Sequence, residues 1–138
     1  MIKQFIVLSV LLFCATFAYT AEQDILDKVE SSARSWLALT DEGLYTKGWK
    51  KASSHFQKKW PESDWVKAID VIKKPLGSME ARYIASAGYS QGLSGFPKGE
   101  YVVVQFYTTF KHRGLAMETI TLAKEKDNTW RVADYVIK

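Results

Sequence analysis

The chain has 138 residues, of which 19 are Lys or Arg and 15 are Asp or Glu, so its formal net charge is +4. Hydrophobic residues make up 47% and charged residues 25%, the proportions of a folded globular protein and not of a disordered chain. A single Cys excludes a disulfide scaffold, and eight Gly exclude a collagen-like repeat. The length predicts one domain.

Residues 1–18 have the layout of a secretory signal peptide. Lys3 gives a short basic start, and residues 5–18 have no formal charge. The segment Thr16-Phe17-Ala18 then places small residues at the −3 and −1 positions of a cleavage site. The apolar run is shorter than the roughly 20 residues that cross a bilayer, and an uncleaved membrane anchor is the alternative.

The export signal is combined with an absence of disulfides, so the core must supply the stability. Cutting after Ala18 removes Cys14, so the mature domain, residues 19–138, has no cysteine. Lipidation at Cys14 is disfavoured because the large Leu12-Phe13 pair precedes it. We expect a periplasmic or secreted protein with no transmembrane segment after cleavage.

The first half of the mature domain has helical periodicity. A capping box, Thr20-x-x-Gln23, predicts the start of a long helix that ends at Gly43. A shorter helix is predicted from Asp41, and Ser54-x-x-Gln57 predicts the cap of a further turn. The last helix runs from Pro61-Glu62 to the breaker Pro75-Leu-Gly77. The side chains expected on its core face are Trp65, Ala68, Ile69 and Ile72.

From residue 79 onward the apolar period changes to two, which indicates strands. Four strands are predicted, at 79–89, 101–110, 115–123 and 130–137. A Gly, Pro and Ser-rich loop joins the first two, and tight turns join the others. Helices followed by an antiparallel meander predict an α+β fold, with N-terminal helices packed on a curved four-stranded antiparallel sheet.

The order of several landmarks resembles a bacterial family of exported domains of unknown function, family 4019. The matching stretches are Trp36-Leu-Ala-Leu-Thr-Asp41, Trp49, Ala52-Ser53, Trp65, Pro75-Leu-Gly77, Arg82, Gly99–Phe106, Glu118–Leu122 and Trp130–Tyr135. The resemblance covers about residues 33–138 and implies a cone-shaped fold similar to nuclear transport factor two. It implies no activity. Relatives tend to have Gly where this chain has Asp134.

Glu118 is the candidate catalytic residue. It is in register with Ala116, Ile120 and Leu122 on the more apolar face of its strand. A lone carboxyl group inside the sheet would have a raised pKa and could act as a general acid or base. The alternative is a structural ion pair with Arg82 or Arg131 on a neighbouring strand.

Aromatic residues could line a ligand pocket, although core packing is the better default. Together with Arg82, the ligand-binding candidates are Trp49, Tyr101, Tyr107 and Trp130.

Other catalytic patterns are weak. The string Gly88-Tyr-Ser90-Gln-Gly92 matches a nucleophile elbow, but the residues that follow cannot begin the helix which that motif needs. Only His55 and His112 could serve as imidazole ligands, and they lie in different elements, so we expect no metal and no cofactor.

The segment 47–60 combines five Lys with several aromatic residues. It fits a solvated helix face, with contact to an acidic envelope surface as the remaining hypothesis. We expect no nucleic acid as partner, since the chain has no nucleic-acid fold signature.

These observations predict an exported cell-envelope binding or accessory domain whose partner is an envelope protein or a small ligand. The alternative is a small-molecule carrier or a small cone-fold enzyme that uses a pocket walled by the sheet. A wide sheet can also bury its open face against a second copy, so a homodimer is a further prediction.

Overall fold

The computed structural model describes the backbone of residues 2–138 and the side chains from residue 21 onward. The elements are α1 (Ile2–Asp41), α2 (Tyr45–Lys51), α3 (Ser54–Lys59), α4 (Glu62–Lys73), a 3-10 helix η1 (Lys74–Leu76), β1 (Met79–Ser90), β2 (Tyr101–Phe110), β3 (Gly114–Lys124) and β4 (Trp130–Ile137). The predicted α+β class is confirmed. The signal-peptide prediction, residues 1–18, falls outside the described side chains.

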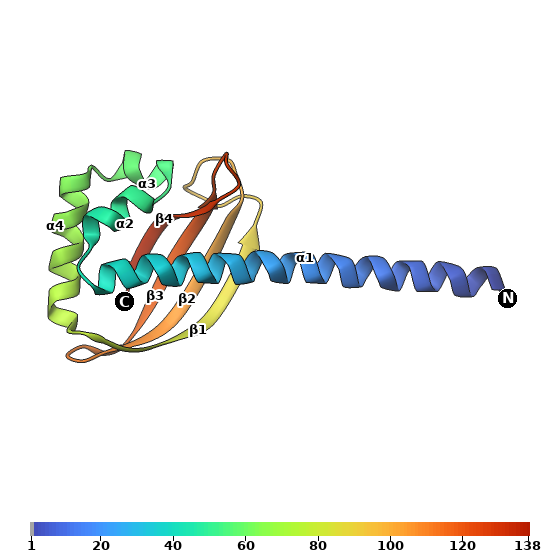
Figure 1. Ribbon diagram of the computed structural model, residues 1–138, viewed down its shortest axis with the longest axis horizontal. Helices are drawn as coiled ribbons and strands as arrows, with labels where there is room; N and C mark the ends of the chain where they lie inside the picture. Colours follow the sequence, from blue (N-terminus) through green and yellow to red (C-terminus); the bar gives the residue numbers. More distant parts are fainter. Residues whose placement is uncertain (1) are drawn as a thin grey trace.

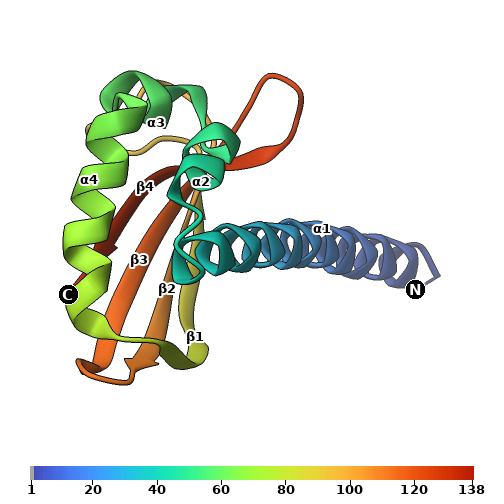
Figure 2. The same ribbon diagram turned by 60° about the vertical axis from the view of Figure 1, so that its left-hand side comes forward.

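The four strands form one antiparallel sheet in the order β1-β2-β3-β4. The C-terminal half of α1 lies across the strands, and α2, α3 and α4 are grouped around its C-terminal end (Figure 1). A turned view shows all of the helices on the same face of the sheet (Figure 2). Among the described residues, we find no helix with the length and apolar character that crossing a membrane requires.

The predicted start of the first helix at Thr20 is wrong, because α1 continues through this position without a break. Residues 2–41 contain neither Gly nor Pro, so nothing in this stretch interrupts the backbone hydrogen bonds. The helix ends where predicted. Gly43 has a φ of +76°, a left-handed conformation that glycine adopts without strain.

Three details of the shorter helices differ from prediction. The helix expected from Asp41 begins at Tyr45, because Asp41 still belongs to α1. Ser53, one residue before the expected Ser54, is the N-cap of α3, and its Oγ accepts from the backbone N–H of Phe56 at 3.1 Å. In α4 the predicted core residue Ile72 is 44% exposed, whereas Lys73 is buried. The buried positions of α4 therefore recur every four residues, because the Lys73 ammonium finds a buried carboxylate partner.

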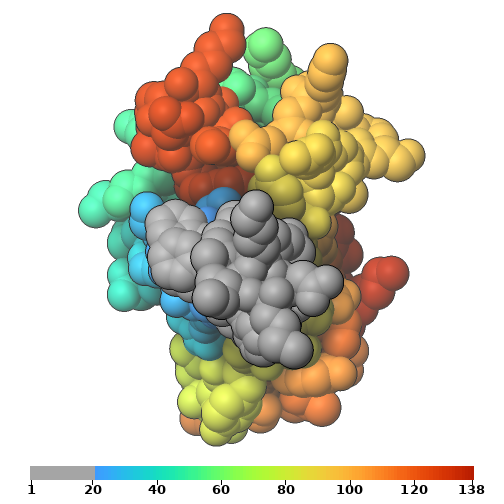
Figure 3. Space-filling model, turned by 90° about the vertical axis from the view of Figure 1, so that its right-hand side faces the viewer, coloured from blue at the N-terminus to red at the C-terminus, as the bar shows by residue number. Residues whose placement is uncertain are grey.

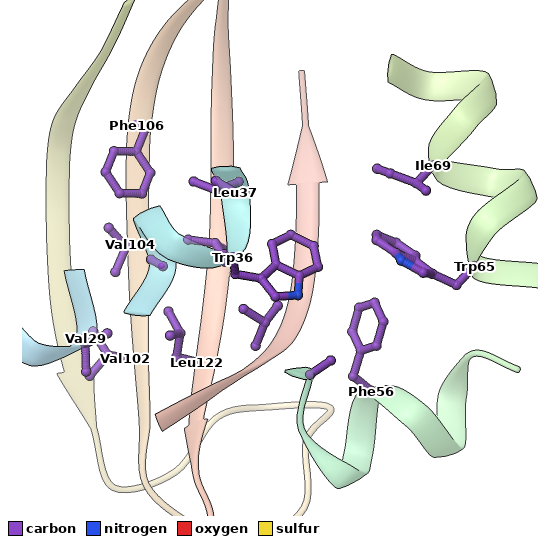
Figure 4. Close-up of a cluster of buried hydrophobic side chains, with 14 residues drawn as sticks. Val29, Trp36, Leu37, Phe56, Trp65, Ile69, Val102, Val104, Phe106 and Leu122 are labelled. Carbon is purple, nitrogen blue, oxygen red and sulfur yellow. The ribbon is translucent and has the colours of Figure 1, made fainter. Parts of the chain in front are cut away.

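The hydrophobic core lies between the helices and the sheet. Trp36 is at its centre, with Phe56 and Trp65 on one side and Val102, Val104 and Leu122 of the strands on the other (Figure 4). The Trp36 and Trp65 ring centroids are 5.8 Å apart. Trp36 Nε1 also donates to the carbonyl oxygen of Gly48 at 2.9 Å, so α1 is tied to α2 by a buried hydrogen bond.

None of the described helices lies over the outer face of the sheet (Figure 2). Tyr83, Tyr107 and Leu115 are 70%, 47% and 64% exposed. Register places Tyr83 opposite Tyr107, so the two aromatic rings are on neighbouring strands of this face. The homodimer prediction concerns this surface and stays a prediction.

Candidate functional site

Glu118 is fully buried and every oxygen of its carboxylate has a partner. Arg82 Nε donates to Oε1 at 2.8 Å, and Thr108 Oγ1 donates to the same oxygen at 2.5 Å. The Tyr135 hydroxyl donates to Oε2. The sequence predicted Arg82 or Arg131 as the ion-pair partner, and the structure selects Arg82.

A second carboxylate extends this cluster toward the end of α1. Arg82 donates through Nη1 and Nη2 to Asp41, at 2.7 and 3.0 Å, and Lys73 Nζ donates to Asp41 at 3.0 Å. Lys73 Nζ also lies 4.8 Å from the centroid of the Phe110 ring. We call the chain Lys73–Asp41–Arg82–Glu118–Tyr135 the buried network.

The pKa shifts show how this network is held in one charge state. Burial alone would raise the pKa of Asp41, but the hydrogen bonds and positive charge of Arg82, followed by those of Lys73, lower it below its ordinary 3.8. Burial raises the pKa of Tyr135, and the Glu118 carboxylate raises it further. Near neutral pH the phenol therefore keeps its proton and remains a donor to Glu118.

A groove lies elsewhere, between α1, the end of α2 and the start of β4. Its volume is about 460 Å³. The buried side chains Trp36, Leu122 and Val132 form its base. Figure 3 shows the orange-red hairpin between β3 and β4 above blue and cyan residues of α1 and α2. The rest of the described lining adds Leu39 and Trp130 to polar and cationic side chains, and none of these residues is a carboxylate: Ser31, Ser32, Ser35, Leu39, Lys50, Lys51, Thr129, Trp130 and Arg131.

The structure divides the lysine-rich segment 47–60 into separate groups. Lys50 and Lys51 line the groove, whereas Lys58 and Lys59 belong to α3 and do not. Lys59 Nζ is 3.6 Å from Asp134. The segment is therefore not one continuous binding surface.

The remaining ligand-binding candidates are not brought together. Trp130 lines the groove, and Arg82 belongs to the buried network. Trp49 is half-buried and its Nε1 donates to the carbonyl oxygen of Trp60 at 2.7 Å. Tyr101 is buried and donates to the carbonyl oxygen of Pro97, and Tyr107 is on the outer sheet face. Only Trp130 thus lines the groove.

The weaker motifs also occupy separate places. Ser90 ends β1 and is followed by a loop, as predicted. His55 stacks near Phe96, with ring centroids 5.4 Å apart, and His112 lies in the turn after β2. Within residues 21–138 the structure contains no group of three His, Cys, Asp or Glu side chains that could hold a metal ion.

A family comparison matches most of the chain that builds both regions. The model of a protein of unknown function (DUF4019) matches residues 32–135. The chain belongs to this family. The match confirms the predicted resemblance, while the similarity to nuclear transport factor two and a bacterial, exported origin stay predictions. No curated protein matches the chain.

The DUF4019 match includes all five members of the buried network and most of the groove. Three of those members, Asp41, Lys73 and Tyr135, are not among the site residues that the sequence predicts. Asp41 follows an apolar helical stripe and precedes a turn, and a lysine in the last turn of a helix, as Lys73 is, ordinarily just complements the negative helix end. A contact between residues 32 positions apart leaves no local signal in one sequence.

Proposed function

We propose that this member of the DUF4019 family is an exported binding domain of the cell envelope that performs no chemistry of its own. Its ligand occupies the groove between α1, α2 and β4. The observation that supports this function is the unpaired charge of that groove. Lys50 and Lys51 are exposed at its wall, and among the described side chains neither makes an ion pair.

Exposed ammonium groups beside a hollow can exchange water for an anionic ligand at low cost, because no internal partner has to be displaced. The volume of about 460 Å³ is within the range of about 300–1,000 Å³ that is typical of small-molecule sites. Export is supported by the signal-like residues 1–18.

The alternative, a carrier or enzyme that uses Glu118, has less support. The Glu118 carboxylate accepts from three donors and is fully buried, so a substrate proton has no path to it. A hollow of about 250 Å³ does lie beside Asp41 and Lys73, at the far end of the buried network. Glu118 is not among the residues that line that hollow.

The test is native mass spectrometry of the protein isolated from the cells that make it. We expect an added mass on the wild-type chain and its loss from the double variant Lys50→Glu, Lys51→Glu. The matched control is Lys58→Glu, Lys111→Glu, which changes the net charge equally at exposed residues away from the groove. It should keep the added mass.

A weakly held ligand requires a second measurement. Soluble extract of the cell envelope is added to the ¹⁵N-labelled chain, and amide shifts are recorded. Shifts around Trp130 that disappear only in the groove variant support the function. A chain that is bare in the first measurement and unshifted in the second contradicts it. Sequencing of the isolated N-terminus tests export separately, with Tyr19 as the expected first residue.

A further inference from the structure

We propose that the groove binds a short acidic saccharide, with the acidic group at Lys50 and Lys51 and a sugar ring against Trp130. This inference rests on the proposed function and names its ligand class. Nothing in the family match assigns a ligand to this surface.

The two lysine ammonium groups are available because another side chain caps their helix. Lysines in the last turn of a helix often bond to the terminal carbonyl oxygens. In α2 the Gln57 amide takes that role, since its Nε2 donates to the carbonyl oxygens of Trp49 and Lys50 at 2.9 and 3.2 Å. The ammonium groups of Lys50 and Lys51 are therefore not needed to cap α2 and remain available at the groove.

Arg131 contributes less charge than the two lysines. Its Nε donates to Thr129 Oγ1 at 3.2 Å, and its Nη2 lies 3.5 Å from Asp127. The positive potential is therefore strongest at the α2 end of the groove, where an acidic group gains most. This difference in potential along the groove orients the ligand, with its acidic group toward α2.

The groove also offers what a sugar ring requires. Trp130 is half-buried at one end of the lining and can present its indole to the C–H face of a ring. Ser31 and Ser32 of α1 make no side-chain hydrogen bond among the described residues, so their hydroxyls can donate and accept. Ser35 already donates to the carbonyl oxygen of Ser31 at 2.9 Å and retains its acceptor capacity.

A neighbouring open hollow extends the surface past Trp130. It shares Ser31, Ser32, Thr129 and Trp130 with the groove, and it adds Asp27, Lys28 and Asn128. Carboxylates on this side, Asp27 there and Asp127 in the hairpin, disfavour a continuous polyanion. The site therefore fits an acidic sugar unit beside the lysines followed by an uncharged or less charged unit, and it does not fit a nucleic acid strand.

Isothermal titration of the isolated protein tests this ligand class. The probes are digalacturonic acid, a sulfated heparin disaccharide, neutral lactose, sodium sulfate and a dT oligonucleotide. We expect at least one acidic disaccharide to bind about tenfold more tightly than lactose or sulfate alone, and more weakly as salt rises. Which acidic disaccharide binds distinguishes a carboxylate from a sulfate as the recognised group.

Variants locate the binding. Lys50→Gln, Lys51→Gln should weaken it about tenfold, and Lys58→Gln, Lys111→Gln should leave it within about twofold. Trp130→Ala should also weaken it, but this residue packs against the core, so its folded state must be verified by circular dichroism. The lysine variants are exposed and keep the test valid whether or not Trp130→Ala folds.

Several results would overturn the ligand class. If lactose binds as tightly as the acidic disaccharides, charge does not contribute to recognition. If sulfate alone binds as tightly, the sugar ring does not contribute. A dT oligonucleotide that binds most tightly, and loses affinity in the Lys58 variant, indicates a nucleic-acid surface. If no saccharide binds while the isolated protein retains its lysine-dependent added mass, the saccharide is wrong and the proposed function stands. If that mass is also missing and the envelope extract causes no shifts, both fail.

Discussion

Two pairs of cations in this protein differ in what surrounds them. Arg82 and Lys73 are buried, and their donors end on Asp41 and Glu118. Lys50 and Lys51 are exposed and line a groove that has no carboxylate in its wall. A buried cation is tolerated only when carboxylates satisfy it, so the first pair belongs to the fold. An exposed cation has no such requirement and remains available for a ligand.

The largest effect should come from breaking the buried network at its centre. Arg82→Met leaves the Asp41 and Glu118 carboxylates without their shared cation, and we expect a loss of about 3–5 kcal/mol in the free energy of unfolding. Urea denaturation measures this loss. The exposed Arg113 is the matched control, and Arg113→Met should change stability by no more than about 0.5 kcal/mol. Equal losses in both variants would show that the buried and exposed cations do not differ.

Two tryptophans test whether hydrogen-bond satisfaction also matters for buried neutral donors. Trp36 and Trp65 are both 4% exposed, but Trp36 Nε1 donates to Gly48 whereas Trp65 Nε1 has no partner among the described residues. We expect Trp36→Phe to lower the free energy of unfolding by about 1–3 kcal/mol more than Trp65→Phe, because it leaves the buried carbonyl oxygen of Gly48 without its donor. Thermal unfolding of the two variants gives the difference. Similar costs would mean that ring volume alone decides.

The pH dependence of stability isolates one carboxylate of the buried network. The folded pKa of Asp41 is lowered from 3.8, so its contribution is fully present above about pH 4 and is lost as pH falls through the folded pKa. Wild type should exceed Asp41→Asn in stability near neutral pH, and the gap should shrink on acidification below pH 4. Denaturant titrations at several pH values measure the gap, and the exposed Glu42→Gln provides the control. A gap that stays constant would exclude this role for Asp41.

The smallest effect should come from the groove. Reversing both charges in Lys50→Glu, Lys51→Glu should change the free energy of unfolding by no more than about 0.5 kcal/mol, because these side chains are exposed and unpaired among the described residues. Chemical denaturation checks this. A loss above about 2 kcal/mol would assign the lysines to the fold and remove the basis of the comparison.

The sequence was informative wherever a local pattern decided the structure. Alternating apolar residues predicted the bounds 101–110 and 130–137 of β2 and β4, and Gly43 predicted the end of α1. The same local rules failed at Thr20, since a capping box does not start a helix when no breaker separates it from a preceding helical stretch. They also failed at Ile72, which is exposed, whereas the neighbouring Lys73 is buried in an ion pair with the distant Asp41.

By itself, then, the sequence determined the α+β class, the order of the strands and the position of Glu118 on the inner face, because periodicity and turn residues act over a few positions. Only the tertiary structure decided which charges meet. Arg82 lies 41 residues from Asp41 and 36 from Glu118 along the chain, yet it bonds to both. It likewise placed Lys50 and Lys51 beside Trp130. Carboxylates pair with the two buried cations, whereas the two exposed lysines have no partner among the described residues. Whether a given Lys or Arg is paired cannot be inferred from its residue type alone.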